Sequence, residues 1–264
     1  MNRSELAEAN RLAWNEAAPR HERFLSTLIE RFKKPGYNIL GPLGTEAFTE
    51  LGIKGKSVAQ LCCNNGRELL SVRNLGADRC VGFDISEEFI KQAQLLTRTN
   101  NRDCEFVCAD VHEIPAIYDG CFDIVFYSAG SLRWMPDLVP FFSVIVRLLK
   151  PNGWLLAQEI HPILDMFENE RGGPSPKVCA SYFRTKPFVQ EGGLDYYGKT
   201  TYDSPPAYWF HHKLSDVIQA AIANGLRVTS FTEHEHDVSN AYRHLQKLKL
   251  KFPMSYTLVA RREA

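Results

Sequence analysis

The fold is decided by the stretch Lys56-Ser-Val-Ala-Gln-Leu-Cys-Cys-Asn-Asn-Gly66-Arg-Glu-Leu-Leu70, which is followed after a short interval by Val81-Gly-Phe-Asp84-Ile-Ser86. An apolar run, a turn of small residues, a helical pattern and a second apolar run ending in an aspartate are typical of the first βαβ unit of a nucleotide-type site. Gly66 suits the turn because a residue without a Cβ adopts backbone conformations that other residues resist. Asp84 lies 18 positions after Gly66, close to the spacing of about 20 at which an acid accepts the ribose hydroxyls.

The chain continues this alternation of strand and helix patterns as far as residue 160. The patterns predict strands at 57–62, 79–84, 104–108, 122–128 and 153–160, and helices at 66–75, 86–99 and 137–149. Ser86 is a good helix start, since its hydroxyl can cap free N–H groups and the acids after it suit the positive end of the helix dipole. Parallel neighbours need crossover connections, so the alternation predicts an α/β fold with a mostly parallel sheet.

The two ends of the chain carry further elements. Apolar residues recur at three- and four-residue steps over 4–32, and we expect Pro19 to divide this helix in two. A short helix near 45–51 completes an N-terminal helical cap over 1–55. After the alternating region, the patterns predict a helix at 213–224 and strands at 226–233 and 255–260.

Four blocks of the sequence resemble class I S-adenosylmethionine (SAM) dependent methyltransferases. Gln60-Leu-Cys-Cys-Asn-Asn-Gly66 resembles a degraded form of that family's acid-x-Gly-x-Gly-x-Gly loop. The three others follow in the family's order: Ala109-Asp110-Val111, Phe122-Asp-Ile-Val-Phe-Tyr-Ser-Ala129 and Leu148-Leu-Lys-Pro-Asn-Gly-Trp-Leu-Leu156. The resemblance spans Lys56 to His161. It implies a Rossmann-like, seven-stranded sheet with one antiparallel strand, because the family's last two strands form a hairpin-like pair.

The resemblance also divides the chain. We expect a single methyltransferase domain over 1–264, with a cofactor-binding core at 56–161, a lid or substrate insertion at 162–210 after the fifth strand, and a C-terminal helix and strand pair at 211–264. A structureless loop as long as the insertion is unusual in a compact domain, so we expect a β-rich unit. Its aromatic residues fit a substrate wall and a small core of the insertion equally well: Tyr182, Phe183, Phe188, Tyr196, Tyr197, Tyr202, Tyr208, Trp209 and Phe210.

The family's cofactor contacts can be carried over residue by residue. Asp84 would bridge the ribose hydroxyls, Asp110 and Val111 would meet the adenine, and Ser128 and Ala129 the methionine part. The implied SAM-binding residues are Trp14, Gln60, Cys62, Asn64, Gly66, Asp84, Ile85, Asp110, Val111, Ser128 and Ala129. Trp14 is included because its helix resembles the N-terminal helix that closes over SAM in many small-molecule methyltransferases. An amphipathic helix with one buried tryptophan would have the same pattern.

Three residues depart from the family's loop. Gln60 stands where the family has an acid. Its neutral amide oxygen can still accept a hydrogen bond from an ammonium group, but the bond lacks the negative charge that a carboxylate would add. Cys62 and Asn64 replace two of the three glycines. Cys62 is small, and Asn tolerates positive φ better than other residues with a Cβ. We therefore expect the loop geometry to survive and the affinity for SAM to be modest.

Histidines supply the candidates for acid–base chemistry. Glu159 and His161 are two residues apart at the expected end of the fifth strand, which would place both side chains on one face. His161 is the first candidate for a base or substrate-orienting group, and His211 after the aromatic insertion is the second. Both residues also have a purely structural alternative: Glu159 could anchor the insertion, and His161 could form a hydrogen bond to the backbone. The His234-Glu-His236-Asp237 run has no third ligand at a convincing spacing, so we expect no metal.

Composition narrows the function further. The chain has 31 basic and 31 acidic residues among 264, so no global field favours nucleic acid or an anionic membrane. Since the sequence shows no signal-peptide pattern and no long apolar run, we expect a cytoplasmic protein, either a monomer or a homodimer.

The expected function is SAM-dependent methyl transfer to a small-molecule acceptor. The alternatives are a nicotinamide-dependent oxidoreductase, whose opening βαβ unit is similar, and a non-catalytic SAM-binding protein.

Overall fold

The structure is a computed structural model that describes the chain except residues 101–102, 169–176, 196–197, 199, 240 and 250. Its helices are α1 (Arg3–Glu22), α2 (Leu25–Phe32), α3 (Gly41–Glu50), α4 (Arg67–Asn74), α5 (Glu87–Thr99), α6 (Leu138–Leu148), α7 (Leu214–Ala223) and α8 (Arg243–Gln246). Its strands are β1 (Ser57–Leu61), β2 (Arg79–Asp84), β3 (Glu105–Cys108), β4 (Phe122–Tyr127), β5 (Leu149–Ile160), β6 (Phe188–Gln190), β7 (Ala207–Trp209), β8 (Leu226–His234) and β9 (Ser255–Arg262).

The main sheet has seven strands in the order β3-β2-β1-β4-β5-β9-β8. The first five strands along the chain pair in parallel. Strand β9 runs antiparallel to both of its neighbours, β5 and β8. The prediction of a Rossmann-like, mostly parallel sheet with one antiparallel strand is therefore confirmed. The carboxyl ends of β1, β2 and β4 meet at one edge, where ligands bind in open α/β sheets.

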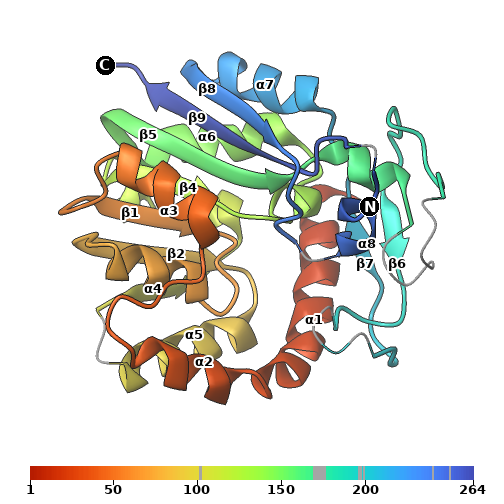
Figure 1. The fold of residues 1–264 in the computed structure, drawn as a ribbon, viewed down its shortest axis with the longest axis horizontal. Coiled ribbons are helices and arrows are strands. Elements are labelled where there is room, and N and C mark those ends of the chain that lie inside the picture. The colour runs from red at the N-terminus through yellow and green to blue at the C-terminus, as the bar shows by residue number, and fades with distance from the viewer. Residues whose placement is uncertain (101–102, 169–176, 196–197, 199, 240, 250) are drawn as a thin grey trace.

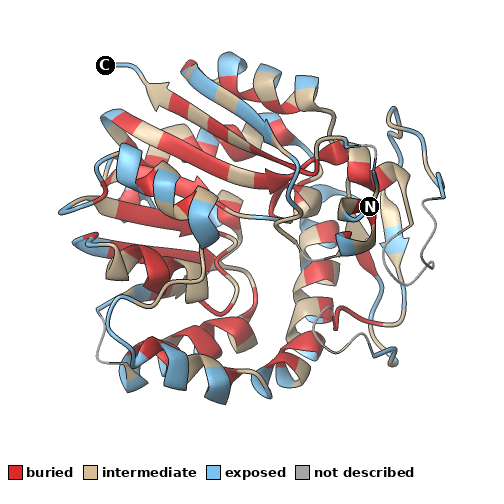
Figure 2. Cartoon of the chain, viewed as in Figure 1, coloured by how far each residue is buried: buried red, intermediate tan, exposed pale blue. Residues whose placement is uncertain are grey.

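Helices cover both faces of this sheet (Figure 1). On one face, α6 and α7 pack through side chains such as Phe141 and Val217 against the strands. On the other, α3, α4 and α5 pack through side chains such as Phe48 and Leu69. Burial follows the same layers, with the strands at the centre buried and the outer helix faces exposed (Figure 2). Apolar burial on both faces is what a parallel sheet between helices requires.

The first helix does not divide at Pro19, so that expectation was wrong. Helix α1 continues through Pro19 to Glu22, and α2 begins at Leu25. A proline inside a helix removes one backbone hydrogen bond, but α1 is held by its packing. Ala18 is buried, and its carbonyl accepts a hydrogen bond of 2.7 Å from Gln92 Nε2 on α5. Tertiary contacts thus keep the helix intact across the proline.

The insertion contains two short strands, as expected for a β-rich unit. Strands β6 and β7 pair antiparallel, and the rings of Phe188 and Trp209 stack with their centroids 3.8 Å apart. Helix α1 lies between this pair and the core (Figure 1). Its buried Asn10 holds β7 by two hydrogen bonds, from Tyr208 N to Oδ1 at 2.7 Å and from Nδ2 to Tyr208 O at 2.9 Å. Tyr196 and Tyr197 lie outside the described residues.

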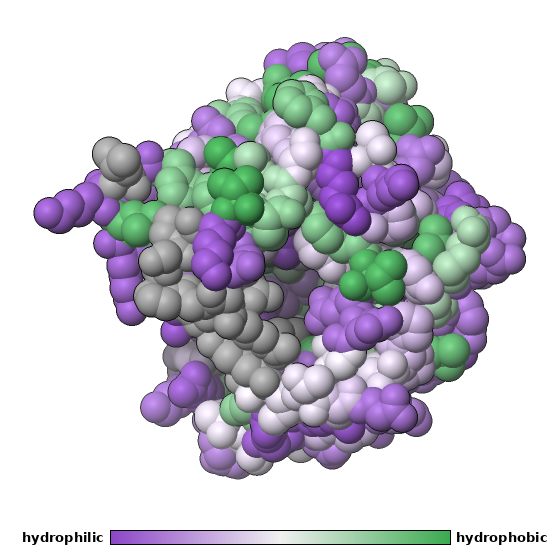
Figure 3. Space-filling model, turned by 90° about the vertical axis from the view of Figure 1, so that its right-hand side faces the viewer, coloured by the Kyte–Doolittle hydropathy of each residue, from purple (hydrophilic) through white to green (hydrophobic). Residues whose placement is uncertain are grey.

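Seen from the side of β6 and β7, the described surface carries hydrophobic side chains in separate small groups among hydrophilic ones (Figure 3). Among the helices in the described part of the chain, none is long and apolar enough to span a bilayer.

Candidate active site

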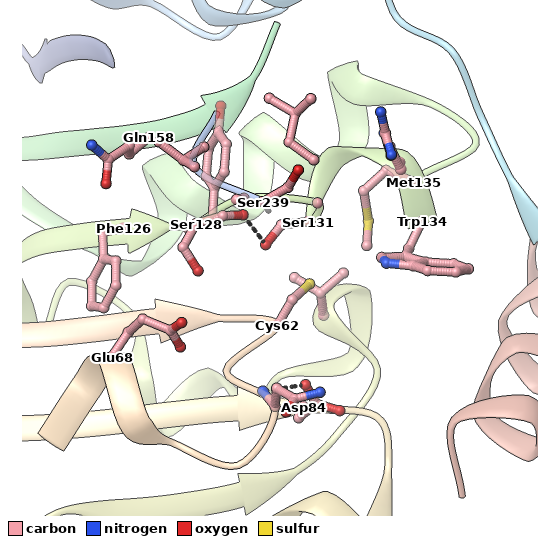
Figure 4. Close-up of a pocket in the computed structure, with 18 of the residues that line it drawn as sticks. Cys62, Glu68, Asp84, Phe126, Ser128, Ser131, Trp134, Met135, Gln158 and Ser239 are labelled. Atoms are coloured by element: carbon pink, nitrogen blue, oxygen red, sulfur yellow. Dashed lines mark hydrogen bonds between the residues drawn. The ribbon is translucent and has the colours of Figure 1, made fainter. Parts of the chain in front are cut away.

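A cavity of about 840 Å³ lies at the carboxyl ends of β1, β2 and β4. Figure 4 shows labelled side chains from the turn after β1 and from β2, β4 and β5 projecting into it. Nine of the predicted SAM-binding residues line it: Trp14, Cys62, Asn64, Asp84, Ile85, Asp110, Val111, Ser128 and Ala129. Segments far apart in the sequence therefore converge where the sequence placed the cofactor.

The turn after β1 uses left-handed backbone at alternate residues. The φ angles are 54° at Cys62, 49° at Asn64 and 73° at Gly66, the three positions where the resembled family has glycine. A Cβ on Gly66 would lie 2.4 Å from the Phe106 ring, so this position accepts glycine alone. Cys62 and Asn64 adopt the same backbone at a cost of roughly 1–2 kcal/mol each. The loop geometry expected from the sequence is thus present despite its substitutions.

Asp84 is tied to this turn. Its Oδ2 accepts a hydrogen bond of 2.7 Å from Asn64 N, and its Oδ1 accepts one of 2.9 Å from Ser86 N. Burial raises the pKa of the Asp84 carboxyl, while the backbone N–H donors act in the opposite direction. Each carboxylate oxygen retains a second lone pair. The side chain lines the cavity, so it can accept hydroxyl donors there.

Trp14 reaches the cavity from α1. Its ring packs edge-on against Trp134, with centroids 5.1 Å apart, and against Phe89 at 5.7 Å. The neighbouring Asn15 Oδ1 accepts a hydrogen bond of 2.7 Å from the Ser86 hydroxyl, at the start of α5. These contacts fix the helix against the cavity.

Gln60 and Gly66 are not among the described residues that line the cavity. Gln60 is fully buried behind it. Its Nε2 lies 3.4 Å from the Ser128 hydroxyl, a cavity residue, and its Oε1 has no hydrogen-bond partner among the described residues. Buried amide oxygens are normally satisfied, so the orphaned Oε1 marks a position that suits a donor from a ligand or water.

Glu159 organises the loop after β4. Its carboxylate accepts hydrogen bonds from the backbone N–H groups of Gly130, Leu132 (3.1 Å) and Ile160 (2.7 Å). Burial raises the pKa of Glu159 to about 7. The three N–H donors and the positive charge of Arg133 act in the opposite direction, but burial has the larger effect. The side chain therefore holds the segment that carries Ser128 and Ala129.

His161 and His211 are not among the described residues that line the cavity. Strand β5 ends at Ile160, as predicted, and His161 follows it in extended backbone as the cap of a short 3₁₀ helix. Its Nδ1 accepts from Ile163 N, and its Nε2 lies 2.9 Å from Glu233 Oε1. His211 Nδ1 lies 3.0 Å from Asp165 Oδ2. Both imidazoles are engaged in contacts within the protein.

Two walls of the cavity were missed from the sequence. One is α3 with the residues before it, including Leu40, Leu43 and Phe48; the other is the described part of 236–241, between β8 and β9. Gln158 also lines the cavity from β5, and a polar residue within an apolar strand was a signal that the sequence offered. His236 lines the cavity, whereas His234 Nε2 lies 2.9 Å from Thr257 Oγ1. In the described part of the chain, no cluster of three or more His, Cys, Asp or Glu side chains could hold a metal.

Comparisons with known proteins agree with this geometry. Residues 59–157 match the family described as "Methyltransferase domain". The chain is 28% identical over 214 residues to a trans-aconitate 2-methyltransferase of Escherichia coli, covering 75% of this chain and 78% of that protein. It is 24% identical over 182 residues to an uncharacterized methyltransferase of Bacillus subtilis, covering 69% of each chain.

Solved structures share the fold. A SAM-dependent methyltransferase of Mesorhizobium loti superimposes with a TM-score of 0.57 at 18% identity, covering 82% of this chain and 96% of that one. A geranyl diphosphate C-methyltransferase of Streptomyces coelicolor, solved with Mg²⁺, geranyl diphosphate and S-adenosylhomocysteine, gives 0.55 at 13% identity, covering 83% and 78%. None of these matches supports an oxidoreductase. Over residues 59–157 the chain carries a methyltransferase domain, and it shares the fold of solved SAM-dependent methyltransferases.

Proposed function

We propose that this enzyme transfers the methyl group of SAM to a small-molecule acceptor, with SAM along the Cys62–Gly66 turn and the acceptor in the part of the cavity beneath α3. One observation carries the proposal: the predicted SAM-binding residues and an apolar wall supplied by α3 and the sheet line the same cavity.

The residues on the cofactor side fit SAM. Asp84 retains acceptor capacity for two ribose hydroxyls, and Asp110 keeps a second oxygen while its Oδ1 accepts from His112 N at 2.9 Å. The left-handed turn brings backbone close to the ligand, and the orphaned Gln60 Oε1 suits a donor at the methionine end. The Cys62 thiol also lines this side. Burial raises its pKa strongly, so it stays a neutral thiol beside an electrophilic methyl group.

The acceptor side is predominantly apolar. Leu43 and Phe48 of α3, Phe126 of β4 and Leu156 of β5 line this part of the cavity, and the Phe48 and Phe126 rings pack edge-on with centroids 5.1 Å apart. Gln158 adds a hydrogen-bonding group to this wall. A volume of about 840 Å³ falls within the range of pockets that enclose small ligands, roughly 300–1,000 Å³. These features support a small, largely apolar acceptor with at least one polar group.

The reaction places modest demands on the protein. Bound SAM supplies a methyl group on a sulfonium, which is already a good leaving group. The chain's residues then have to hold the acceptor atom in line and exclude water. Trp14 and Trp134 on one side and the α3 wall on the other serve both tasks. We propose that His161 and His211 support the walls, since hydrogen bonds within the protein engage both rings.

The cofactor assignment is tested by replacing Asp84 and measuring S-adenosylhomocysteine binding by calorimetry. Losing a charged acceptor from a buried site costs on the order of 1.5–3 kcal/mol, so Asp84→Ala should weaken binding about tenfold to a hundredfold. Asp119→Ala is the matched control, because Asp119 pairs with Arg147 away from the cavity. Binding by Asp84→Ala within twofold of wild type would refute the assignment.

The acceptor class is tested by methyl transfer from radiolabelled SAM to a panel of small molecules. The panel contains hydroxylated aromatic compounds, apolar amines, trans-aconitate and geranyl diphosphate, the last two because relatives in the comparisons are named for them. We expect turnover with an apolar member that carries one polar group. Turnover confined to trans-aconitate would contradict the apolar assignment.

A further inference from the structure

The cofactor's amino-acid end poses a charge problem in this enzyme. SAM and S-adenosylhomocysteine both carry an ammonium group there, and the resembled family places an acid at the end of its first strand. Here that position is Gln60, which is fully buried and neutral. Its orphaned Oε1 can accept one hydrogen bond, but a neutral acceptor forms a weaker bond to an ammonium than a carboxylate does.

A second acid lies on the same face of the sheet. Glu68 is in the first turn of α4, directly after the Cys62–Gly66 turn, and it lines the cavity. Its side chain is 19% exposed. Figure 4 shows its carboxylate beside the Phe126 ring, at the end of the cavity bounded by Gln158. In strand register, Phe126 is the partner of Gln60, so both side chains project from one face of neighbouring strands.

This placement has a direct chemical reading. Resting on the proposed function, we propose that Glu68 supplies the carboxylate for the cofactor's ammonium group that Gln60 does not, and that Gln60 Oε1 remains as a neutral second acceptor. The negative charge is supplied from the helix after the turn instead of from the strand before it.

The contacts of Glu68 leave room for this role. Its Oε1 lies 3.1 Å from Arg67 Nε. Its Oε2 makes no hydrogen bond to a residue that the structure describes, and a carboxylate can accept several donors. The purely structural reading is that Glu68 stabilises the positive end of the α4 dipole. That reading predicts an effect on stability and none on ligand choice, so the two can be separated.

The experiment compares two ligands with the full-length protein by calorimetry. S-adenosylhomocysteine carries the ammonium group, whereas 5′-methylthioadenosine shares the adenosine and thioether and lacks the amino-acid end. Glu68→Gln should weaken S-adenosylhomocysteine binding about tenfold or more, the fold-change expected for losing a charge-assisted contact. It should leave 5′-methylthioadenosine binding within twofold. Glu88→Gln is the matched control, since Glu88 holds the equivalent place in the first turn of α5 and faces Lys91.

A compensating change sharpens the test. In the Glu68→Gln background, Gln60→Glu restores the family's acid and should recover most of the lost S-adenosylhomocysteine affinity. Equal weakening of both ligands by Glu68→Gln, or unchanged binding of both, would overturn the inference. If the wild-type protein binds neither ligand, the proposed cofactor site fails instead. If the wild-type protein binds both ligands and Glu68→Gln affects the two affinities equally, the cofactor site stands and only the role of Glu68 fails.

Discussion

The buried carboxyl of Glu159 makes a contribution to the stability of this enzyme that falls as pH rises and can be measured. Glu159 is 3% exposed, and burial raises the pKa of its carboxyl from the ordinary 4.5 to about 7 in the folded chain. The folded state therefore binds a proton more tightly than the unfolded state between these two values. The resulting stability is fully present below the unfolded pKa and is lost as pH rises through the folded pKa. Linkage gives a loss of about 2 kcal/mol between about pH 5.5 and about pH 8.

The perturbation that isolates this effect is Glu159→Gln, because the amide cannot titrate. One amide group cannot satisfy all three backbone N–H donors, so the variant should lose about 1–3 kcal/mol at low pH. The difference in the free energy of unfolding between wild type and variant should then narrow by about 2 kcal/mol as pH rises to about 8, where the wild type has to bury a charge.

Urea denaturation of both proteins at the two pH values measures this difference, with Glu46→Gln, an exposed position on α3, as the control that should follow wild type. If the difference in the free energy of unfolding between wild type and Glu159→Gln stays constant with pH, Glu159 does not have a raised pKa. That result would mean that the N–H groups of Gly130, Leu132 and Ile160 outweigh burial and keep Glu159 ionised throughout.

Two further predictions concern the turn and the histidine. Gly66→Ala should lower the free energy of unfolding by about 2 kcal/mol or more, since its Cβ would meet the Phe106 ring at a positive φ; thermal unfolding within 1 °C of wild type would contradict this. His161→Ala should cost about 1–3 kcal/mol, because it leaves Ile163 N and Glu233 without their partner. Affinity of His161→Ala for S-adenosylhomocysteine should stay within twofold by calorimetry, and a tenfold loss would place the imidazole in the cofactor site.

Sequence reasoning succeeded where one short segment dictates the outcome. The strands follow from apolar runs, and the Cys62–Gly66 turn follows from three small or turn-forming residues at alternate positions. Asp84 reaches the cavity because it ends β2. In each case the neighbours along the chain supply the constraint, so the periodicity and the turn chemistry were sufficient.

Predictions failed where partners distant in the sequence decide. Pro19 stays within α1 because Gln92, more than 70 positions later, holds the helix onto α5. The α3 wall is built by packing against Phe126 and Gln158, and no local pattern identifies which face of a short helix meets a cavity. His161 does not line the cavity because its ring bonds to Glu233 of β8, a partner 72 positions later.

The bridge between α1 and β7 also bears on how the chain assembles during synthesis. Asn10 is synthesised long before its hydrogen-bond partner Tyr208, which lies 198 positions later in the chain. Ala13 and Ala17 likewise pack against Leu194 and Ala207 of the insertion. Helix α1 therefore cannot complete its docking until Leu194, Ala207 and Tyr208 have been synthesised. Contacts of such long range slow folding, so the buried alanines of α1 stay exposed to solvent until the insertion has been synthesised.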